Sequence, residues 1–441
     1  MAKTTGLSRW ISLAIVFFVV WGVLVPFFGF RDTTELHVYV LGAQRLLAGD
    51  PIHVVTSGVP PFAYPPVFAI PFIPIAHAPE TVQRLCWLGA QVIMVMAIIA
   101  MINSVVSPFI ERRAKERNEA SWRPALFFWF LLALLGGRYL LSPLENQSHD
   151  LMVMVCILGG VLLGGRGREF GGGLLLGLAA AMKATPLLFL PVLIWQRRWR
   201  ATGAMILGLS VASVAADLVL PPEDGPWNLV RWVEISSSAA QPGKSGSDTI
   251  WAAWNPMNQN LSGMVHRWTT DSPSNGSGEI RQAILPMGKA SQERVIKVAQ
   301  LLILALVFLG TFSWGRRGRV DRDLVPLRRL AEAGVVACGM LLLSPMSSKA
   351  HFALLLMPLA VLILDIDVRR RDPLVLILLV IALFCGPMSS HALVGGDLAD
   401  TLLAIGSVTI AAIAIMLATI RFLWTRPWSG KDAGDPVAEV T

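Results

Sequence analysis

The sequence predicts an all-α polytopic membrane protein, and three observations support this class. Hydrophobic residues make up 54% of the 441 residues and charged residues only 15%, whereas soluble domains usually carry about 25% charged residues. Apolar runs of roughly 17–25 residues, the length that crosses the hydrocarbon core of a bilayer, recur along the chain. Lysines and arginines cluster in short segments between these runs, which is typical of cytoplasmic loops.

The composition also argues against several other classes. A net charge of +8 is compatible with nucleic-acid binding, but the loop pattern of the basic residues accounts for it, and we expect no nucleic-acid partner. The four cysteines lie inside apolar runs, and the seven histidines form neither an HExxH motif nor a Cys/His cluster. We therefore expect no bound metal and no cofactor.

The first apolar run, residues 11–30, follows Lys3 and Arg9. A cleavable signal peptide has a shorter apolar core and a small-residue cleavage site, and this run has neither. We therefore expect a retained first span with the N-terminus in the cytoplasm. Residues 31–80 then form the first outer loop.

The basic segments orient the later spans, because each of them falls on the cytoplasmic side when the chain is threaded from the first span. This threading predicts about eleven or twelve crossings in a single transmembrane domain, residues 1–420, followed by a polar cytoplasmic tail, residues 421–441. The longest polar segment, residues 221–293, lies outside. The predicted spans after the first are residues 83–106, 124–141, 150–165, 201–220, 295–315, 330–345, 352–367, 373–388 and 400–420.

The segment 169–200 begins and ends at arginine-rich loops, so it enters the membrane and returns to the same side. About 13 residues are available on each side of Lys183-Ala184-Thr185-Pro186, which is about 20 Å of helix. That is too short for two complete spans of about 30 Å. Because Pro186 interrupts a helix, we expect a pair of short helices that meet near Lys183 and line a cavity.

The start of the first outer loop raises the question of a catalytic base. Residues 35–48 have the apolar spacing of an amphipathic helix, which we expect to lie flat on the outer membrane surface. In "DTTE", Asp32 and Glu35 have the spacing of a capping box, and a carboxylate that caps a helix is a poor base. Alternatively, Glu35 shares a helix face with Tyr39 and deprotonates a sugar hydroxyl. The spacing alone leaves both interpretations open.

Five motifs, in order between about residues 31 and 365, resemble the signature of one family. They are "ELHVYVLGAQRLLAGDPIH", "FAYPPVFAIPFIP", "GGGLLLGLAAAMKATPLLFLPVLIWQRRWRA", "NQNLSG" and "LLLSPMSSKAHFALLLMPLAVL". The chain resembles a bacterial GT-C glycosyltransferase family that uses polyprenyl-phosphate sugars. This family includes actinobacterial phosphatidylinositol-mannoside mannosyltransferases and arabinofuranosyltransferases. The resemblance implies a GT-C-type fold whose outer loops carry the active site.

Three motifs depart from the family pattern. The acidic residue before Leu-x-Val-Tyr is usually Asp, whereas here it is Glu35, with Asp32 as a competing candidate. The family's Gly-Gln-x-Asn is replaced by residues 146–149, and its Asp-His-His by residues 349–351. The substitutions lie at outward positions, which suggests a different substrate or a diverged activity.

The resemblance implies a hexosyltransferase of the bacterial cell membrane that acts on the extracytoplasmic face. The sugar, mannose first and arabinofuranose second, passes from a polyprenyl phosphate to a lipid or glycan acceptor by a single inverting displacement. An acidic residue removes the acceptor proton, and cations meet the charge of the leaving phosphate. The candidate bases are Glu35 and Asp32; the candidate phosphate ligands are Lys183, Arg138, Lys349 and His351; the candidate substrate contacts are Tyr39, Tyr64, Gln147, His149, Asn258 and Gln259.

Other interpretations of the same features remain. Lys183 either binds phosphate, snorkels toward the surface or pairs with a carboxylate, and Arg138 also suits a membrane-interface position. The whole chain is alternatively a non-catalytic transporter or flippase of lipid-linked glycans, or a membrane scaffold. The absence of a visible internal repeat and the outward bias of the polar residues disfavour the transporter.

Overall fold

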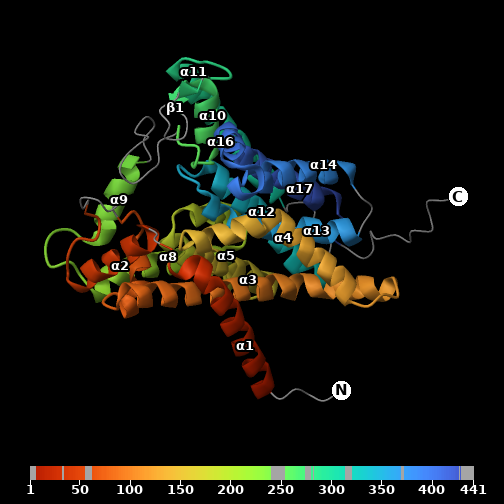
Figure 1. Cartoon of the computed structure of the whole chain (residues 1–441), viewed down its shortest axis with the longest axis horizontal. Helices are drawn as coiled ribbons and strands as arrows, with labels where there is room; N and C mark the ends of the chain where they lie inside the picture. Colours follow the sequence, from red (N-terminus) through yellow and green to blue (C-terminus); the bar gives the residue numbers. More distant parts are fainter. Residues whose placement is uncertain are drawn as a thin grey trace.

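The computed structural model of the chain is built almost entirely from helices (Figure 1). One short antiparallel ladder joins β1 (Ser272–Pro273) to β2 (Ile280–Arg281). The residues that the structure describes are 6–31, 34–54, 62–239, 254–273, 280–281, 283–312, 320–368, 372–426 and 428.

Among the described residues, five helical segments are long and apolar enough to cross a membrane: α3 (Glu80–Glu116), α4 (Trp122–Glu145), α8 (Trp199–Val219), Lys349–Ile366 and α17 (Ser407–Thr425). Shorter apolar helices accompany them, including α1 (Gly6–Leu24) with η1 (Val25–Gly29), α5 (Asp150–Gly165), α6 (Glu169–Met182), α7 (Phe189–Trp195) and α14 (Pro373–Cys385). The chain is an all-α polytopic membrane protein, as predicted. The number of crossings and the single-domain organisation stay predictions.

The remaining helices include two more predicted spans, whereas the predicted span 400–420 is divided between α16 (Gly396–Ile405) and α17 at Gly406. The segment Lys349–Ile366 consists of η5 (Lys349–Leu355) and most of α13 (Leu356–Val368). The predicted spans 295–315 and 330–345 correspond to α11 (Lys289–Gly310) and α12 (Val325–Leu343). The other helices are α2 (Thr34–Leu47), η2 (Pro66–Ile75), η3 (Thr185–Leu188), α9 (Asn228–Ala239), α10 (Leu261–Thr269), η4 (Arg322–Leu324), η6 (Pro387–Ser389) and α15 (His391–Val394).

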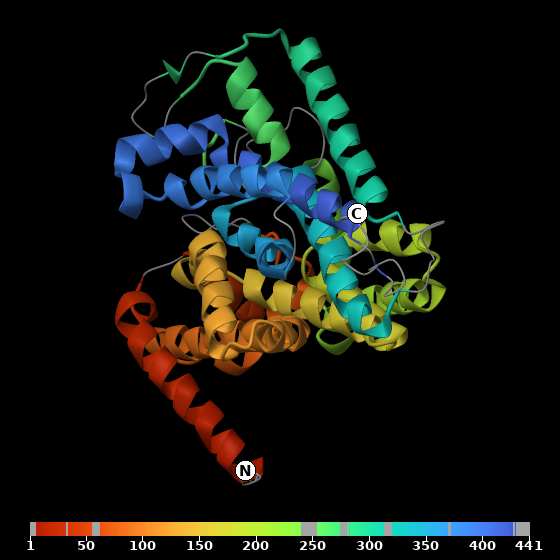
Figure 2. The same ribbon diagram turned by 90° about the vertical axis from the view of Figure 1, so that its right-hand side faces the viewer.

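Helix α1 projects away from the body of the molecule, with the N-terminus at its far end (Figures 1 and 2). Large apolar side chains are exposed along it, including Ile15, Phe18 and Val19. Such a surface is stable in contact with lipid but not with water. This arrangement agrees with the prediction that the first apolar run is a membrane span.

The amphipathic helix α2 is present, but its apolar face does not lie on a membrane surface as expected. Tyr39, Val40, Ala43 and Leu46 on this face are buried, because α2 packs against η2. The Gln44 side chain donates a hydrogen bond of 2.7 Å to the carbonyl oxygen of Ala76, just after η2. The periodicity predicted the face correctly, whereas the partner that covers it is another part of the first outer loop.

Glycines allow α6 and α8 to pack closely. A side chain at Gly173 or Gly177 of α6 would meet the backbone carbonyl of Ala201 or Met205 of α8 inside contact distance. On α8, a Cβ at Gly208 would lie 2.7 Å from the carbonyl oxygen of Leu174. Small residues that bring two backbones together are the usual basis of helix packing in membranes. The contact fixes the position of α6, whose last residue, Met182, precedes Lys183.

The predicted break at Lys183 is confirmed. Helix α6 ends at Met182, and Lys183 has extended backbone angles (φ −152°, ψ 129°). The chain then continues through η3, which has Pro186 in its first turn, into α7. Because proline lacks an N–H group and clashes with a preceding helical turn, α6 and α7 do not merge into one helix.

A tight turn, residues 146–149, joins α4 to α5. Gln147 adopts a left-handed conformation (φ +53°), which lets the Ser148 N–H bond to the carbonyl oxygen of Pro143 at 2.9 Å. Two side chains of α3 hold the turn: Trp87 Nε1 donates to the oxygen of Gln147 at 2.7 Å, and Gln91 Nε2 donates to the oxygen of Ser148 at 2.9 Å. The turn therefore holds its last residue, His149, and the following residue, Asp150, in a fixed orientation.

Candidate active site

The first half of the site is the carboxylate of Glu35, in the first turn of α2. Its Oε2 atom accepts hydrogen bonds from the hydroxyl groups of Tyr39 at 2.6 Å and of Tyr64 at 3.0 Å. No hydrogen bond to the other oxygen, Oε1, is found among the described residues, and the Glu35 side chain is partly exposed. Two hydroxyl groups thus hold one oxygen of this carboxylate.

A buried histidine lies behind the tyrosines. His149 Nδ1 is 3.1 Å from the hydroxyl oxygen of Tyr39. Because the hydroxyl proton of Tyr39 is directed to Glu35, its oxygen accepts from His149, which places the imidazole proton on Nδ1. The Nε2 atom of His149 is buried without a partner in the described part of the chain. Burial lowers the pKa of His149 to about 3, so the ring is neutral.

The tyrosines remain protonated. Burial raises the pKa values of Tyr39 and Tyr64 well above 10, and the nearby charge of Glu35 raises them further. The His149 ring packs edge-on against Tyr64 at a centroid distance of 4.6 Å, and in a tilted arrangement against Phe68 at 4.5 Å. The aromatic packing fixes the orientation of the hydroxyl groups that hold Glu35.

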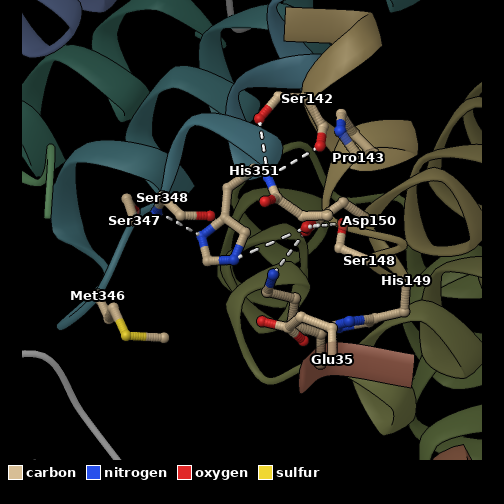
Figure 3. Close-up of polar contacts among 12 residues, drawn as sticks. Glu35, Ser142, Pro143, Ser148, His149, Asp150, Met346, Ser347, Ser348 and His351 are labelled. Carbon is tan, nitrogen blue, oxygen red and sulfur yellow. Dashed lines mark hydrogen bonds and ion pairs between the residues drawn. The ribbon is translucent and has the colours of Figure 1, made fainter. Parts of the chain in front are cut away.

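The second half of the site is centred on Asp150, the first residue of α5 (Figure 3). Its Oδ1 atom accepts a hydrogen bond of 2.6 Å from Lys183 Nζ, and its Oδ2 atom accepts one of 2.9 Å from Ser148 Oγ. His351 Nε2 lies 3.8 Å from Oδ2. The Asp150 and Lys183 side chains are only 8% and 16% exposed, so this ion pair is largely shielded from water.

The segment before His351 is held by backbone and side-chain bonds. The backbone N–H of Ser348 donates to His351 Nδ1 at 3.2 Å, which leaves the proton of a neutral ring on Nε2, the atom that faces Asp150. A small cavity with room for about one water molecule lies among these groups. It is lined by Asp150, Lys183, Thr185, Ser344, Ser347 and His351, together with apolar side chains of α5, α12 and η5.

The two other candidate cations lie apart from this pair. Arg138 donates to the carbonyl oxygens of Gly386 and Ser389 at 2.7 Å and to the Ser389 hydroxyl, so it ties α4 to η6. Lys349 is partly buried, and no hydrogen bond or ion pair to it is found among the described residues. Its charged neighbours are Arg138, Glu145 and Asp400. A role for either residue in binding the donor phosphate stays a prediction.

The predicted amide contacts are buried and bond to the backbone. Gln147 Nε2 donates to the oxygen of Phe28 at 3.2 Å, and Gln259 Nε2 donates to the oxygen of Leu403 at 2.7 Å. Asn258 Oδ1 accepts from the N–H of Ser347 at 3.0 Å, and so braces the segment that carries His351. Direct contacts of these amides with a substrate stay predictions. The competing base Asp32 lies outside the described residues.

The sequence patterns missed Asp150. It was counted only as the first residue of a membrane span, although an acidic residue at the membrane boundary of an apolar helix is a signal for function. The pairing of Lys183 with a carboxylate was one of the expected alternatives, and it is confirmed. The identity of that carboxylate depends on the packing of α5 against α6 and is not contained in either motif.

Comparisons with known proteins complete the description of the site. The sequence model of glycosyltransferase family 87 matches residues 62–345. The chain is similar to a polyprenol-phosphate-mannose-dependent alpha-(1-2)-phosphatidylinositol pentamannoside mannosyltransferase of Mycobacterium tuberculosis (strain CDC 1551 / Oshkosh). The two are 24% identical over 357 residues, which cover 80% of this chain and 70% of the relative. The protein of the same description from Mycolicibacterium smegmatis (strain ATCC 700084 / mc(2)155) is 29% identical over 187 residues, covering 41% and 42% of the two chains. No solved structure matches the chain.

Proposed function

Because the chain belongs to glycosyltransferase family 87 and is a glycosyltransferase, we propose that it transfers mannose from a polyprenyl-phosphate donor to a hydroxyl group of a lipid or glycan acceptor. The two relatives, described as polyprenol-phosphate-mannose-dependent mannosyltransferases that act on a phosphatidylinositol mannoside, support this donor. The observation that carries the proposal is the placement of a partly exposed carboxylate, Glu35, and of the Lys183–Asp150 pair on either side of the turn 146–149.

In the proposed reaction Glu35 is the general base. Its Oε1 atom takes the proton of the acceptor hydroxyl as the hydroxyl oxygen forms a bond to the anomeric carbon. The bond between that carbon and the phosphate oxygen breaks, and polyprenyl phosphate leaves with the electron pair. One displacement inverts the configuration of the anomeric carbon. Tyr39 and Tyr64 hold Oε2, so that Oε1 keeps a fixed direction toward the acceptor.

The proposed role of Lys183 and His351 is to stabilise the leaving phosphate. The ammonium of Lys183 has N–H groups beyond the one that Asp150 accepts, and His351 directs Nε2 toward the same small cavity. Positive charge and N–H donors that are held in place before the reaction stabilise the charge that develops on the leaving oxygen. This chemistry requires neither a metal nor a cofactor, and we propose none.

We further propose that the enzyme resides in the bacterial cell membrane, with both termini in the cytoplasm and the site on the extracytoplasmic face. The distribution of the basic segments supports this orientation. The site residues of α2, of the 146–149 turn and of the break at Lys183 all belong to segments that the same threading places at the outer side.

A reconstituted assay tests the proposed function. Purified protein in liposomes is given polyprenyl phosphate that carries radiolabelled mannose, and extracted membrane lipids are the acceptors. Mannosylated product in the lipid fraction is the expected result, and polyprenyl-phosphate-arabinofuranose is the second donor to be tried. Movement of a fluorescent lipid-linked glycan across the bilayer without any covalent product would instead establish the transporter alternative.

A further inference from the structure

We propose that Asp150 is a positioning residue that holds the side chains of Lys183 and His351 where they receive the phosphate group of the lipid donor. The proposal rests on the function proposed above. It assigns Asp150 no contact with the reacting atoms: Asp150 acts through these two side chains.

The bonding of Asp150 excludes it as a second general base. Each of its oxygens already has a donor, Lys183 Nζ at 2.6 Å on Oδ1 and Ser148 Oγ at 2.9 Å on Oδ2. Its side chain is 8% exposed, so an acceptor hydroxyl has little access to it. Figure 3 shows the Asp150 carboxylate between Ser148 and His351.

The position of Lys183 depends on this carboxylate. Lys183 lies at the break between α6 and η3, where its position is not set by a continuous helix. A free lysine at the edge of a membrane extends its ammonium toward water, and the bond to Asp150 instead holds the ammonium across to α5. An ammonium has three N–H donors, and Asp150 is the partner found for Lys183 among the described residues, which leaves donors for a phosphate.

His351 is held in a complementary way. The Ser348 N–H group fixes Nδ1 as an acceptor, so a neutral ring carries its proton on Nε2. The distance of 3.8 Å from Nε2 to Asp150 Oδ2 is longer than a hydrogen bond. The N–H of Nε2 thus faces the carboxylate without being consumed by it. The small cavity beside Lys183 and His351 has room for one oxygen-sized group.

Two electrostatic effects of Asp150 oppose each other, and their balance is measurable. The carboxylate repels an incoming phosphate, but Lys183 already neutralises most of its charge at 2.6 Å. Without the carboxylate, the lysine is a nearly buried cation without a partner, and the freedom of its side chain must be lost again when phosphate binds. We expect the loss of positioning to exceed the relief of repulsion.

The test compares Asp150→Asn and Asp150→Glu with a matched buried aspartate. Asp217 is also buried, and its two oxygens accept the backbone N–H groups of Asn228 and Leu229 at the start of α9. Asp217→Asn therefore reports the effect of losing a buried carboxylate on folding alone. Melting temperatures of all variants in detergent establish that they fold.

Two measurements on the folded variants follow: the KM for polyprenyl-phosphate mannose, and direct binding of undecaprenyl phosphate to the protein in detergent micelles. We expect Asp150→Asn to weaken both about tenfold or more, Asp150→Glu to recover part of the loss, and Asp217→Asn to change neither. In Asp150→Asn/Lys183→Gln the loss is expected to be smaller than the sum of the two single losses, because Asp150 acts partly through Lys183.

Unchanged or tighter binding of undecaprenyl phosphate by both Asp150 variants would overturn the proposal, and so would additive losses in the double variant. If Asp150→Asn does not fold, the donor KM and the undecaprenyl-phosphate binding of Asp150→Glu test the proposal instead. Direct binding separates this proposal from the proposed function. Wild-type protein that binds undecaprenyl phosphate in an Asp150-dependent way but transfers no mannose would refute the function and leave the positioning role supported. A wild-type protein that does not bind it refutes both.

Discussion

His149 and Asp150 are consecutive in the chain, and their side chains serve opposite halves of the candidate site. His149 Nδ1 contacts the hydroxyl of Tyr39, which donates to Glu35, whereas Asp150 accepts from Lys183. The turn before them is anchored on α3 through Trp87 and Gln91. A displacement of this one turn therefore moves the proposed base and the proposed phosphate ligands together, and both halves keep their spacing only while the turn is rigid.

The first prediction concerns the base. Glu35→Gln is expected to lower kcat at least about 100-fold with little change in KM, because the amide still accepts the bonds from Tyr39 and Tyr64 but no longer takes a proton. Steady-state kinetics with labelled donor measure the effect. Asp32→Asn and Glu80→Gln, an exposed carboxylate at the start of α3, are expected to retain activity within about twofold. Full activity of Glu35→Gln, alone and combined with Asp32→Asn, would refute a carboxylate base.

The second prediction concerns the tyrosine that connects the base to His149. Tyr39→Phe removes the 2.6 Å bond to Glu35 and leaves the buried N–H of His149 without an acceptor. We expect it to lower the free energy of unfolding by about 1–3 kcal/mol and activity about tenfold. Unfolding in a graded detergent or denaturant series measures the stability.

Tyr139→Phe is the matched control for this change. Tyr139 is equally buried, but its hydroxyl has no hydrogen-bond partner in the described part of the chain. Its loss removes no such bond and is therefore not expected to destabilise the protein. Equal effects of the two substitutions would mean that the bonds of Tyr39 contribute nothing specific.

Local patterns in the sequence were sufficient for much of the fold. Hydropathy located α5 at residues 150–165, and the available length together with Pro186 predicted the break after α6. The periodicity of α2 predicted which face is buried but not that η2 covers it. An apolar helix face has the same sequence pattern whether it contacts lipid or another part of the protein. Charged residues did not end α3, which continues to Glu116, because a helix does not stop at the membrane surface.

The site required contacts between distant segments, which single motifs do not specify. Lys183 pairs with Asp150, 33 residues earlier, and Arg138 bonds to Ser389, 251 residues later. The sequence predicted both Arg138 and Lys183 to be candidate phosphate ligands, because both are cations on the predicted outer side of the membrane. Only the packing of α4 against η6 distinguishes Arg138 as a residue that ties two elements together.

The third prediction concerns the dependence of stability on pH. The pKa of His149 is about 3 in the folded protein because the ring is buried, compared with about 6.5 for an unfolded chain. Between these values the unfolded state binds the additional proton, so this group makes stability increase with pH. Its contribution is complete above about pH 6.5 and is lost as the pH falls below that value, at most by about 1.4 kcal/mol per pH unit.

Melting temperatures between pH 4 and pH 8 measure this effect. The decrease below about pH 6.5 is expected to be smaller in His149→Gln. His391→Gln, which removes an exposed histidine, is expected to follow the wild type. Burial lowers the pKa of His53 as well, so some dependence remains in His149→Gln. An identical slope in wild type and His149→Gln would show that His149 is not neutral and buried in the folded protein.

The fourth prediction concerns the helix contact that sets the position of Lys183. Alanine at Gly173 or Gly177 places a methyl group against the carbonyl oxygen of Ala201 or Met205, so α6 and α8 must separate. We expect the free energy of unfolding to fall by about 1–3 kcal/mol. We also expect the KM for the donor to rise in the protein that remains folded, because Lys183 follows directly on α6.

Gly203→Ala is the control, since a Cβ there meets no atom within 4 Å and alanine favours the helix by about 0.5–1 kcal/mol. Unfolding and the KM for the donor are measured on the same preparations. Gly173→Ala that behaves like Gly203→Ala would mean that the close approach of α6 and α8 does not position the proposed phosphate site.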